Sequence, residues 1–237
     1  MPLLLILAII FFLAFLKSPQ GKGWTGELCV KFVIGRTKPD VRYVINDLKL
    51  RVSDDKTSQI DHILINERGV FVIETKNYSG RIYGQENQLE WTQVLNYGRV
   101  KNKMYNPLKQ NKTHVYYVSN LLKEKTPITP AVVFVQGNTE FINASGVYTL
   151  SQFRRLIKSG HRELTVSQMK EIYNTLMSAN DSSITRGEHI QNIHTVTSNV
   201  SNNICPRCGK KLIERNSKNG NFMGCEGFPN CRFTKKL

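Results

Sequence analysis

Residues 59–80, QIDHILINERGVFVIETKNYSG, carry an aspartate, a glutamate and a lysine (Asp61, Glu74 and Lys76) within two apolar runs that are rich in Ile, Val and Phe. The alternation predicts two strands joined by a tight turn over NERG (66–69), with Ile65 opposite Val70. The same register places Asp61 directly opposite Glu74, with Cβ atoms about 5 Å apart. Because side chains alternate faces along a strand, Lys76 shares the face of Glu74. Three charged groups are therefore expected to meet at one point of an apolar hairpin.

Two facing carboxylates repel, so in a partly buried site one would take up a proton unless a cation lies between them. Mg²⁺ or Mn²⁺ suits such oxygen ligands. A bound metal would lower the pKa of a water and neutralise charge on a phosphodiester. Lys76 would orient or deprotonate the attacking water, or stabilise the pentacovalent phosphate. The alternative is a surface salt bridge of Lys76 with Asp61 or Glu74 on a half-exposed sheet.

Structural roles are expected for three residues near this cluster. His62 alternates to the face opposite Asp61, so we favour a structural histidine over a general base. For Tyr78 we favour packing over substrate contact. Cys29 is expected to be a small core residue of the first helix.

Periodicity places these residues in a mixed α/β domain. Residues 24–35, 106–125, 151–159 and 166–178 predict helices, and residues 41–52, 59–65, 69–77, 80–83, 89–94 and 131–137 predict strands. Residues 179–203 are rich in Ser, Asn, Thr and His without apolar periodicity, which predicts a flexible linker.

The C-terminal residues 204–237 form a separate small module. Cys205-x₂-Cys208 and Cys225-x₅-Cys231 are separated by sixteen residues, which favours tetrahedral Zn²⁺ over a reading without metal. A unit this short depends on the metal for its folding energy. With four thiolates bound, no coordination position stays open, so the zinc is expected to be structural.

The hairpin resembles the D…(D/E)-x-K signature of the PD-(D/E)XK nuclease superfamily, and residues 24–135 resemble its nuclease-related (NERD) domain. The matching blocks are Gly26-Glu27, IDHILI, GVFVIETKNYSGRIYG and NPLKQN. The resemblance implies a restriction-endonuclease-like mixed sheet of four or five strands flanked by helices, and metal-dependent cleavage of nucleic acid.

The resemblance also implies roles for individual residues. Asp61 and Glu74 would bind Mg²⁺ or Mn²⁺, and Lys76 would be the catalytic lysine. Glu27 would approach the site from the first helix, and Gln110 from the later helix. Ile60 holds the place of the proline in the Pro-Asp dipeptide, a proline that many members of the superfamily lack.

The cysteine module resembles the zinc ribbon at the C-terminus of type IA topoisomerases. Eight Lys/Arg against two Glu give residues 205–237 a net charge of +6. Exposed aromatic side chains among cations suit single-stranded nucleic acid, although Phe222, Phe228 and Phe233 could instead pack the small core. The expected nucleic-acid-binding residues are Lys210, Lys211, Arg215, Phe222, Phe228 and Arg232.

The N-terminal run PLLLILAIIFFLAFL (2–16) has no charged or polar side chain. Fifteen helical residues reach about 22 Å, short of a hydrocarbon core of about 30 Å. We favour a retained anchor over a cleaved signal peptide, because no basic residue precedes the run and no small residue ends it. Lys17 and Lys22 follow it, which favours a cytoplasmic location for the rest of the chain.

Together these features predict an apolar N-terminal helix that anchors the chain in a membrane (1–17), a NERD-like nuclease domain (24–178), a linker (179–203) and a zinc ribbon (204–237). The formal net charge of +15 suggests a polyanionic partner, which we expect to be DNA, over a merely solvated basic surface. The alternatives are a catalytically inactive nucleic-acid-binding protein with the nuclease fold, and a basic surface that serves an anionic membrane.

Overall fold

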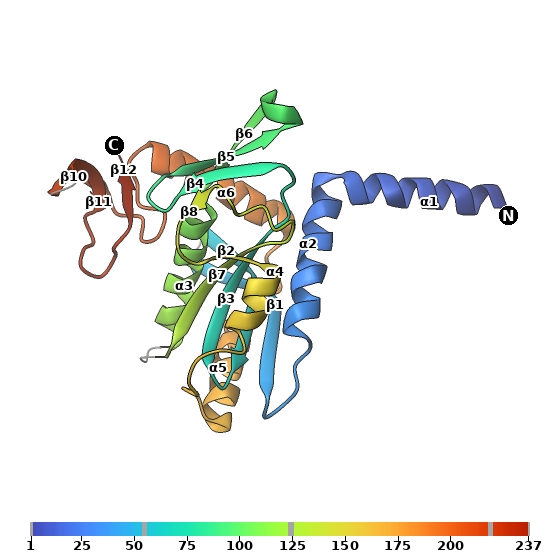
Figure 1. Cartoon of the computed structure of the whole chain (residues 1–237). Coiled ribbons are helices and arrows are strands. Elements are labelled where there is room, and N and C mark those ends of the chain that lie inside the picture. Colours follow the sequence, from blue (N-terminus) through green and yellow to red (C-terminus); the bar gives the residue numbers. More distant parts are fainter. Residues whose placement is uncertain (1, 54–55, 123–125, 218–219, 237) are drawn as a thin grey trace.

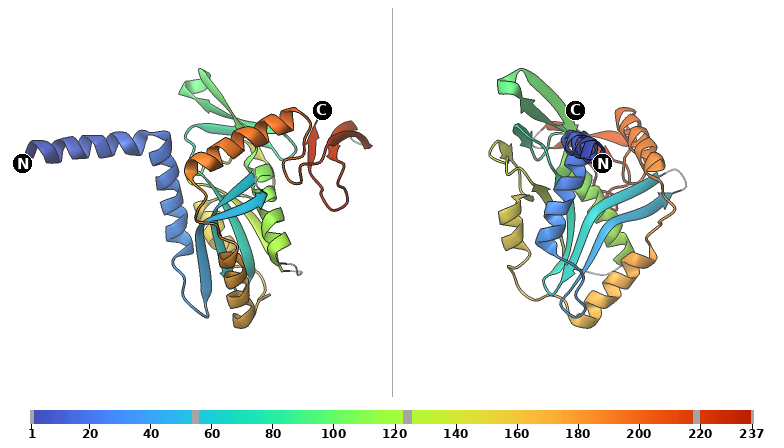
Figure 2. Two further views of the ribbon diagram at one scale, coloured as in Figure 1. Left: turned by 180° about the vertical axis from the view of Figure 1, so that it is seen from behind. Right: turned by 90° about the vertical axis from the view of Figure 1, so that its right-hand side faces the viewer.

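The computed structural model describes residues 2–53, 56–122, 126–217 and 220–236. An α/β body forms the centre of the molecule (Figure 1). The N-terminal helix α1 (Pro2–Lys17) and the small sheet at the C-terminus extend from opposite sides of this body (Figures 1 and 2).

The core of the body is a five-stranded mixed sheet with the order β1-β2-β3-β7-β9. The first three strands run antiparallel, while β7 pairs parallel with β3 and with β9. The strands span Arg42–Ser53 (β1), Lys56–Asn66 (β2), Gly69–Lys76 (β3), Ile128–Phe134 (β7) and Val147–Thr149 (β9). A mixed α/β fold with sheets flanked by helices is therefore confirmed, and the more specific restriction-endonuclease-like topology stays a prediction.

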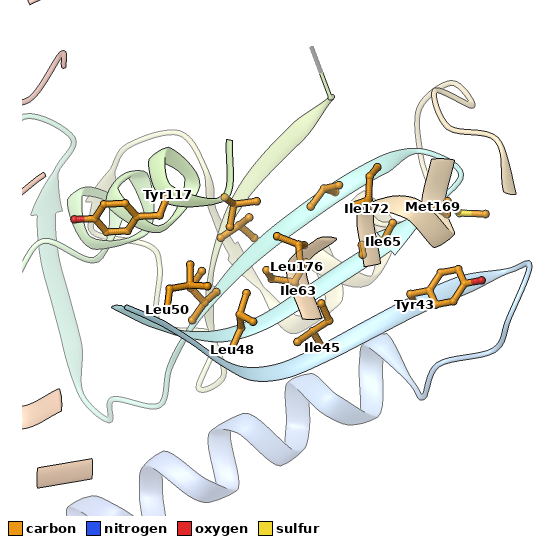
Figure 3. Close-up of a cluster of buried hydrophobic side chains, with 14 residues drawn as sticks. Tyr43, Ile45, Leu48, Leu50, Ile63, Ile65, Tyr117, Met169, Ile172 and Leu176 are labelled. Carbon is orange, nitrogen blue, oxygen red and sulfur yellow. The ribbon is translucent and has the colours of Figure 1, made fainter. Parts of the chain in front are cut away.

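Helices cover both faces of this sheet. On one face, α3 (Pro107–Leu122) and α5 (Val166–Ser178) pack through Tyr117, Met169 and Leu176 against Ile45 and Ile63 of the sheet (Figure 3). On the other face lie α2 (Pro19–Ile34) and α4 (Leu150–Leu156). Each strand of the central hairpin is thus buried on both sides, which explains its nearly continuous apolar sequence.

A second sheet, with the order β6-β5-β4-β8, lies across one end of the body (Figure 1). Its strands span Arg81–Gln85 (β4), Glu90–Leu95 (β5), Val100–Tyr105 (β6) and Ile142–Asn143 (β8), and the short helix η1 (Asn96–Gly98) connects β5 to β6. β4 and β5 agree with the sequence prediction. β6 was not predicted, because VKNKMY has no apolar alternation and is held by its pairing with β5.

The prediction of a flexible linker over residues 179–203 is wrong in its central part. Helix α6 (Arg186–Ser201) occupies it and begins at Thr185, whose side chain accepts a hydrogen bond from the Glu188 N–H. Arg51 of β1 pairs with Asp181 and with Glu188, at 2.8 Å each. These contacts with the sheet order a segment whose own sequence carries no helical periodicity.

The first helices also differ from the prediction. α2 begins five residues before Trp24, because Ser18 caps it and Pro19 occupies the first turn. Within the described residues, no single helix is both long and apolar enough to cross a membrane. Leu4–Lys17 and Pro19–Ile34 meet that criterion only as a pair, and they are bent by 79°.

Candidate functional site

The β2–β3 hairpin has the predicted register over most of its length. Ile65 pairs with Val70, and the ladder continues to His62 opposite Ile73. It ends there, so the expected backbone pair of Asp61 with Glu74 does not form. The Thr75 N–H instead donates to Asp61 Oδ2 at 2.7 Å. Asp61 thus lies beside the backbone of β3 next to Glu74, at an interruption of regular pairing such as often marks functional sites.

The neighbouring strand is irregular at the same place. β1 pairs with β2 at Asn46–His62 and at Leu48–Ile60, but Asp47 between them has a φ of +58° and no partner in the ladder. A positive φ is uncommon for a residue other than glycine. The sheet is therefore distorted on both sides of Asp61.

Glu74, Lys76 and Gln110 form the centre of the site. Glu74 is 2% exposed, and Lys76 Nζ donates to its Oε1 at 2.6 Å. The same ammonium donates to Gln110 Oε1 at 3.1 Å. Because β3 alternates, Glu74 and Lys76 both face α3, which contributes Gln110. The structure thus brings together four of the predicted site residues: Asp61, Glu74, Lys76 and Gln110.

Burial and charge drive the two carboxyl groups in opposite directions. Burial alone would raise the pKa of Glu74, but Lys76 and His114 lower it to about 2. Burial together with the charge of Glu74 raises the pKa of Asp61 well above its ordinary value. Burial alone would lower the pKa of Lys76. The charges of Glu74, Tyr78 and Asp61 outweigh this effect, and the pKa of Lys76 rises above its ordinary range. One carboxylate is thus compensated, whereas the other carries the electrostatic cost of the pair.

His114 is a site residue that the sequence analysis missed. It is buried on α3, and its Nε2 lies 3.3 Å from Glu74 Oε2. Its Nδ1 forms a 2.9 Å hydrogen bond with Ser58 Oγ of β2. His114 follows Gln110 by four residues, so both side chains lie on the same face of the helix. That spacing was the available signal in the sequence.

The start of α3 explains why Gln110 reaches Lys76. Asn106 is fully buried; its Oδ1 accepts from the Leu108 N–H, and its Nδ2 donates to backbone carbonyls of the β4–β5 turn. Asn111 Nδ2 donates to the carbonyls of Val72 and Ala131 on β3 and β7. The NPLKQN segment therefore fixes the start of the helix against both sheets, which sets the position of Gln110.

Glu27 approaches the site without joining it. Gly26 lets α2 come close to β3, since a Cβ at this position would lie 2.7 Å from Asn77 Cβ. Asn77 Nδ2 also donates to the Lys22 carbonyl of α2. Glu27 itself pairs with Lys31 at 3.6 Å and is half-exposed. Burial, with smaller contributions from Asp47 and Glu74, raises the pKa of Glu27 despite Lys31.

The donor set fits a hard divalent cation in part. Glu74 Oε2 is buried and makes no hydrogen bond of regular geometry, although His114 Nε2 lies 3.3 Å away, and burial, together with the charge of Glu74, raises the pKa of Asp61. Both features suit a cation with oxygen ligands. Among the described residues, however, no three His, Cys, Asp or Glu side chains at the hairpin lie close enough together to share a metal ion. The site has two adjacent carboxylates, and Glu27 stands apart.

Two cavities among the described residues lie away from the charged cluster. A cavity of about 500 Å³ opens at the far end of the hairpin, beside Arg42, Arg68 and Ile157. Another, of about 330 Å³, lies between Tyr117 and Arg207. Neither is lined by Asp61, Glu74 or Lys76.

The predictions for His62, Tyr78 and Cys29 have different outcomes. His62 is fully buried and its Nδ1 lies 2.8 Å from Asn46 Oδ1, in agreement with a structural role. Tyr78 packs against the cluster around Trp91. The prediction for Cys29 is wrong, because this cysteine is exposed. It lies off the buried stripe of α2, which contains Gly21, Gly26, Val30 and Ile34.

The four C-terminal cysteines converge as predicted. Their sulfur atoms all lie within 4.8 Å of one another, with Cys205–Cys231 at 3.6 Å and Cys208–Cys225 at 3.3 Å. Tetrahedral zinc–thiolate bonds place sulfur atoms about 3.8 Å apart. Backbone N–H groups of Arg207 and Gly227 point to Cys205 and Cys225. The cluster fits a structural Zn²⁺ site.

The cysteine module contains a three-stranded sheet of β10 (Leu212–Ser217), β11 (Gly220–Cys225) and β12 (Thr234–Lys236). Among its aromatic residues, Phe233 is buried and Phe228 is 58% exposed. Arg215 lies over the Phe228 ring, 5.6 Å from its centroid. Phe222 is half-buried, while Lys210, Lys211 and Arg232 are exposed. The module thus offers an aromatic ring and cations to solvent.

This module contacts helix α3 of the body. The Tyr117 hydroxyl donates to the carbonyls of Pro206 and Arg207, at 3.4 and 3.3 Å. Lys109, next to Gln110, donates to the Thr234 carbonyl at 3.1 Å. Burial and nearby cations lower the pKa of Lys109 to about 8. The same helix therefore holds the cysteine module and carries two residues of the charged cluster.

Comparison with known proteins finds a matching family model for the α/β body and another for the cysteine module. The family model described as nuclease-related domain matches residues 22–135, and the model described as topoisomerase DNA binding C4 zinc finger matches residues 202–237. An uncharacterized protein of Bacillus anthracis is 33% identical over 184 residues, which cover 74% of this chain and 85% of that protein.

The cysteine module matches part of much larger enzymes. DNA topoisomerase 1 of Methanothermobacter thermautotrophicus is 60% identical over 30 residues, which cover 13% of this chain and 4% of the enzyme. DNA topoisomerase 1 of Helicobacter pylori is 41% identical over 32 residues, again 4% of the enzyme. No solved structure matches the chain.

Proposed function

The chain belongs to the nuclease-related (NERD) domain family, and on this premise we propose that it is a metal-dependent nuclease that hydrolyses phosphodiester bonds of DNA. The observation that carries the proposal is the convergence of Asp61, Glu74, Lys76 and Gln110. Two strands and a helix contribute these side chains to an apolar sheet. A buried arrangement of like charges is costly and suggests a function that needs it.

Asp61 and Glu74 would hold Mg²⁺ or Mn²⁺, with Glu27 nearby as a further acidic residue. When bound, the metal would supply charge neutralisation at the phosphodiester and an acidified water. Glu74 Oε2 makes no hydrogen bond of regular geometry, although His114 Nε2 lies 3.3 Å from it. Asp61 would gain a counter-charge for its carboxylate.

Lys76 would act as a fixed cation. Its raised pKa keeps the ammonium protonated at neutral pH, which disfavours proton abstraction and favours stabilisation of the negative charge that develops on the phosphate. Gln110 positions the ammonium through its side-chain oxygen. His114 orients Glu74 from the opposite side.

The zinc ribbon would bind the nucleic acid. Its exposed Phe228, with Arg215 over the ring, resembles a site where a base stacks between an aromatic ring and cations. Lys210, Lys211 and Arg232 would contact phosphates, and Phe222 would extend the aromatic surface. The description of the matching family model as DNA binding supports this assignment.

We also propose that α1 anchors the chain in a membrane with the nuclease domain on the cytoplasmic side. Large apolar side chains are exposed along α1, including Leu4 at 74% and Phe11 at 73%. Flotation with lipid vesicles tests this: the full chain is expected to float, and a chain that begins at Ser18 is expected to stay in the soluble fraction. Flotation of both would leave the basic surface as the membrane contact.

A catalytically inactive nucleic-acid-binding protein is the second candidate. One observation favours it: Lys76 and His114 already compensate Glu74 without any metal. Under this alternative, the chain binds DNA equally well with and without Mg²⁺ and cuts none.

The experiment that separates the two uses the full chain with its zinc. Labelled single- and double-stranded DNA is incubated with Mg²⁺, with Mn²⁺ or with neither, beside the Lys76→Ala variant. Cutting that requires the metal and is lost in Lys76→Ala supports the nuclease. Binding without cutting by either protein supports the inactive alternative.

A further inference from the structure

The sheet formed by β4, β5 and β6 has one face that the body does not cover. Ile82 and Trp91 are fully buried on its inner face, where Trp91 stacks on Phe134 of β7 with ring centroids 6.2 Å apart. The register pairs Arg81 with Val94 and Val94 with Lys101, and it pairs Tyr83 with Thr92 and Thr92 with Lys103. Paired positions share a face, and neighbours along a strand alternate. These two rows of side chains therefore lie on the outer face.

An aromatic pair stands on this outer face. The rings of Tyr83 and Phe141 stack with centroids 4.8 Å apart and an interplanar angle of 20°. They are 39% and 40% exposed. Arg81 lies 5.6 Å from the centroid of the Phe141 ring. Two exposed rings already in parallel stacking, with a guanidinium beside them, form a surface to which another flat ring can add.

The charges around the pair select the partner. Arg81, Lys101 and Lys103 are exposed on the outer face, and the acidic Glu90 lies in the next row of β5. Lys103 Nζ is held by Thr92 Oγ1 at 3.0 Å. A surface that combines stacked rings with a net positive charge matches bases and phosphates. A second copy of this basic chain would be repelled.

The strands of the outer face adjoin the elements of the charged cluster along the chain. β4 follows Lys76 by five residues, and β6 ends at Tyr105, one residue before the Asn106 that caps α3. The sheet is therefore joined directly along the chain to the strand that carries Lys76 and to the helix that carries Gln110.

We propose that the outer face, defined by Arg81, Tyr83, Lys101, Lys103 and Phe141, binds single-stranded nucleic acid, with one unpaired base stacked on the Tyr83–Phe141 pair and the three cations on the phosphates. The inference rests on the proposed function and specifies the form of its substrate. Duplex bases are stacked on each other and cannot use the aromatic pair. The outer face thus favours unpaired strands.

The test measures binding by fluorescence anisotropy with the full zinc-loaded chain in detergent, without added Mg²⁺ or Mn²⁺. The probes are labelled oligomers of about 16 thymidines or uridines, and a DNA duplex of equal length. The double variant Tyr83→Ala/Phe141→Ala is expected to bind both single strands about tenfold more weakly and the duplex unchanged. Equal losses for thymidine and uridine would indicate that the face does not distinguish DNA from RNA.

Two further variants separate stacking from charge. Tyr83→Phe/Phe141→Tyr keeps both rings and is expected to restore the affinity. Lys101→Gln/Lys103→Gln is expected to reduce the slope of log affinity against log salt by about 1.4, because two phosphate contacts are lost. Phe32→Ala, at a ring 90% exposed on α2, and Lys170→Gln on α5 are the matched controls, and both are expected to bind normally.

The inference is overturned if Tyr83→Ala/Phe141→Ala binds the thymidine oligomer as tightly as the wild type, or if it loses duplex and single strand equally. The failure of this inference can be told apart from the failure of the nuclease proposal. A chain that cuts DNA with the outer-face variants unaffected would keep the nuclease and reject this site. Selective binding on the outer face by a chain that never cuts DNA would keep this site and reject the nuclease.

Discussion

His114 Nε2 lies 3.3 Å from Glu74 Oε2, while Lys76 Nζ lies 2.6 Å from the other oxygen of the same carboxylate. Glu74 is therefore fixed from both sides by cationic or potentially cationic groups from different elements. Asp61, its neighbour, accepts from the backbone N–H of Thr75 and forms no ion pair with any residue that the structure describes. This asymmetry between the two carboxylates leads to specific expectations for each residue.

The His114→Ala variant is expected to keep the fold and lower the cleavage rate about 10–100-fold, because residues that orient a metal ligand have effects of that size. The Mg²⁺ concentration for half-maximal cleavage should rise, since Glu74 would no longer be held in one orientation. His161→Ala, in an exposed loop, is the control. An unchanged rate and Mg²⁺ dependence would remove His114 from the site.

The stability of the body is expected to fall in two steps on acidification. Burial, aided by Lys31, lowers the pKa of His62 from 6.5 to about 4, so the unfolded chain binds this proton first and stability is lost as pH falls from 6.5 towards 4. Glu74, with a folded pKa near 2 against 4.5, adds a loss as pH falls from 4.5 towards 2. Each completed step is on the order of 3 kcal/mol.

Urea unfolding followed through the fluorescence of the buried Trp91 measures these steps. The His62→Gln variant should lack the loss between pH 6.5 and 4. If wild type and variant showed the same pH dependence there, the neutral, buried state of His62 would be contradicted.

Removal of zinc is expected to unfold the ribbon and spare the α/β body, because the metal supplies the folding energy of a unit with so small a core. Cys208→Ser should lower the zinc content and expose the ribbon to protease while residues of the body stay protected. Cys29→Ser is the matched control and should keep its zinc, since this cysteine lies on α2. Equal zinc content in both variants would contradict the four-cysteine site.

The sequence predicted elements whose signal is local. The hairpin register followed from alternation and the turn before Gly69, α3 from helical periodicity, and the zinc site from cysteine spacing. Within the site, Asp61, Glu74 and Lys76 were identified from the hairpin register and the alternation of faces, and Gln110 through the family resemblance. The structure brings these four together, while their catalytic roles stay predictions.

What the sequence did not predict depends on tertiary contacts. α6 is ordered by Arg51 of a distant strand, and β6 by pairing with β5. The exposure of Cys29 depends on which stripe of α2 meets the sheet. Contact of His114 with Glu74 requires the rotation of α3 relative to β3, which Asn106 and Asn111 set through backbone contacts.

We expect that catalysis requires the ionised carboxylate of Asp61, and that its ionisation lowers the stability of the folded chain. The folded pKa of Asp61 is raised, so its contribution favours folding below the unfolded pKa and is lost as pH rises through the folded pKa. Asp61→Asn keeps an acceptor for the Thr75 N–H and removes the repulsion with Glu74. At neutral pH the variant should be more stable by about 0.5–2 kcal/mol, and this advantage should vanish as pH falls and the wild-type carboxyl takes up its proton.

The most direct measurement determines thermal unfolding and Mg²⁺-dependent DNA cleavage on the same preparations of wild type, Asp61→Asn and the control Asp47→Asn at neutral pH. We predict that Asp61→Asn unfolds a few degrees higher and cuts no DNA, while Asp47→Asn behaves as the wild type in both assays. Cleavage at the wild-type rate by Asp61→Asn would contradict the account, because the charge would then have no part in the reaction.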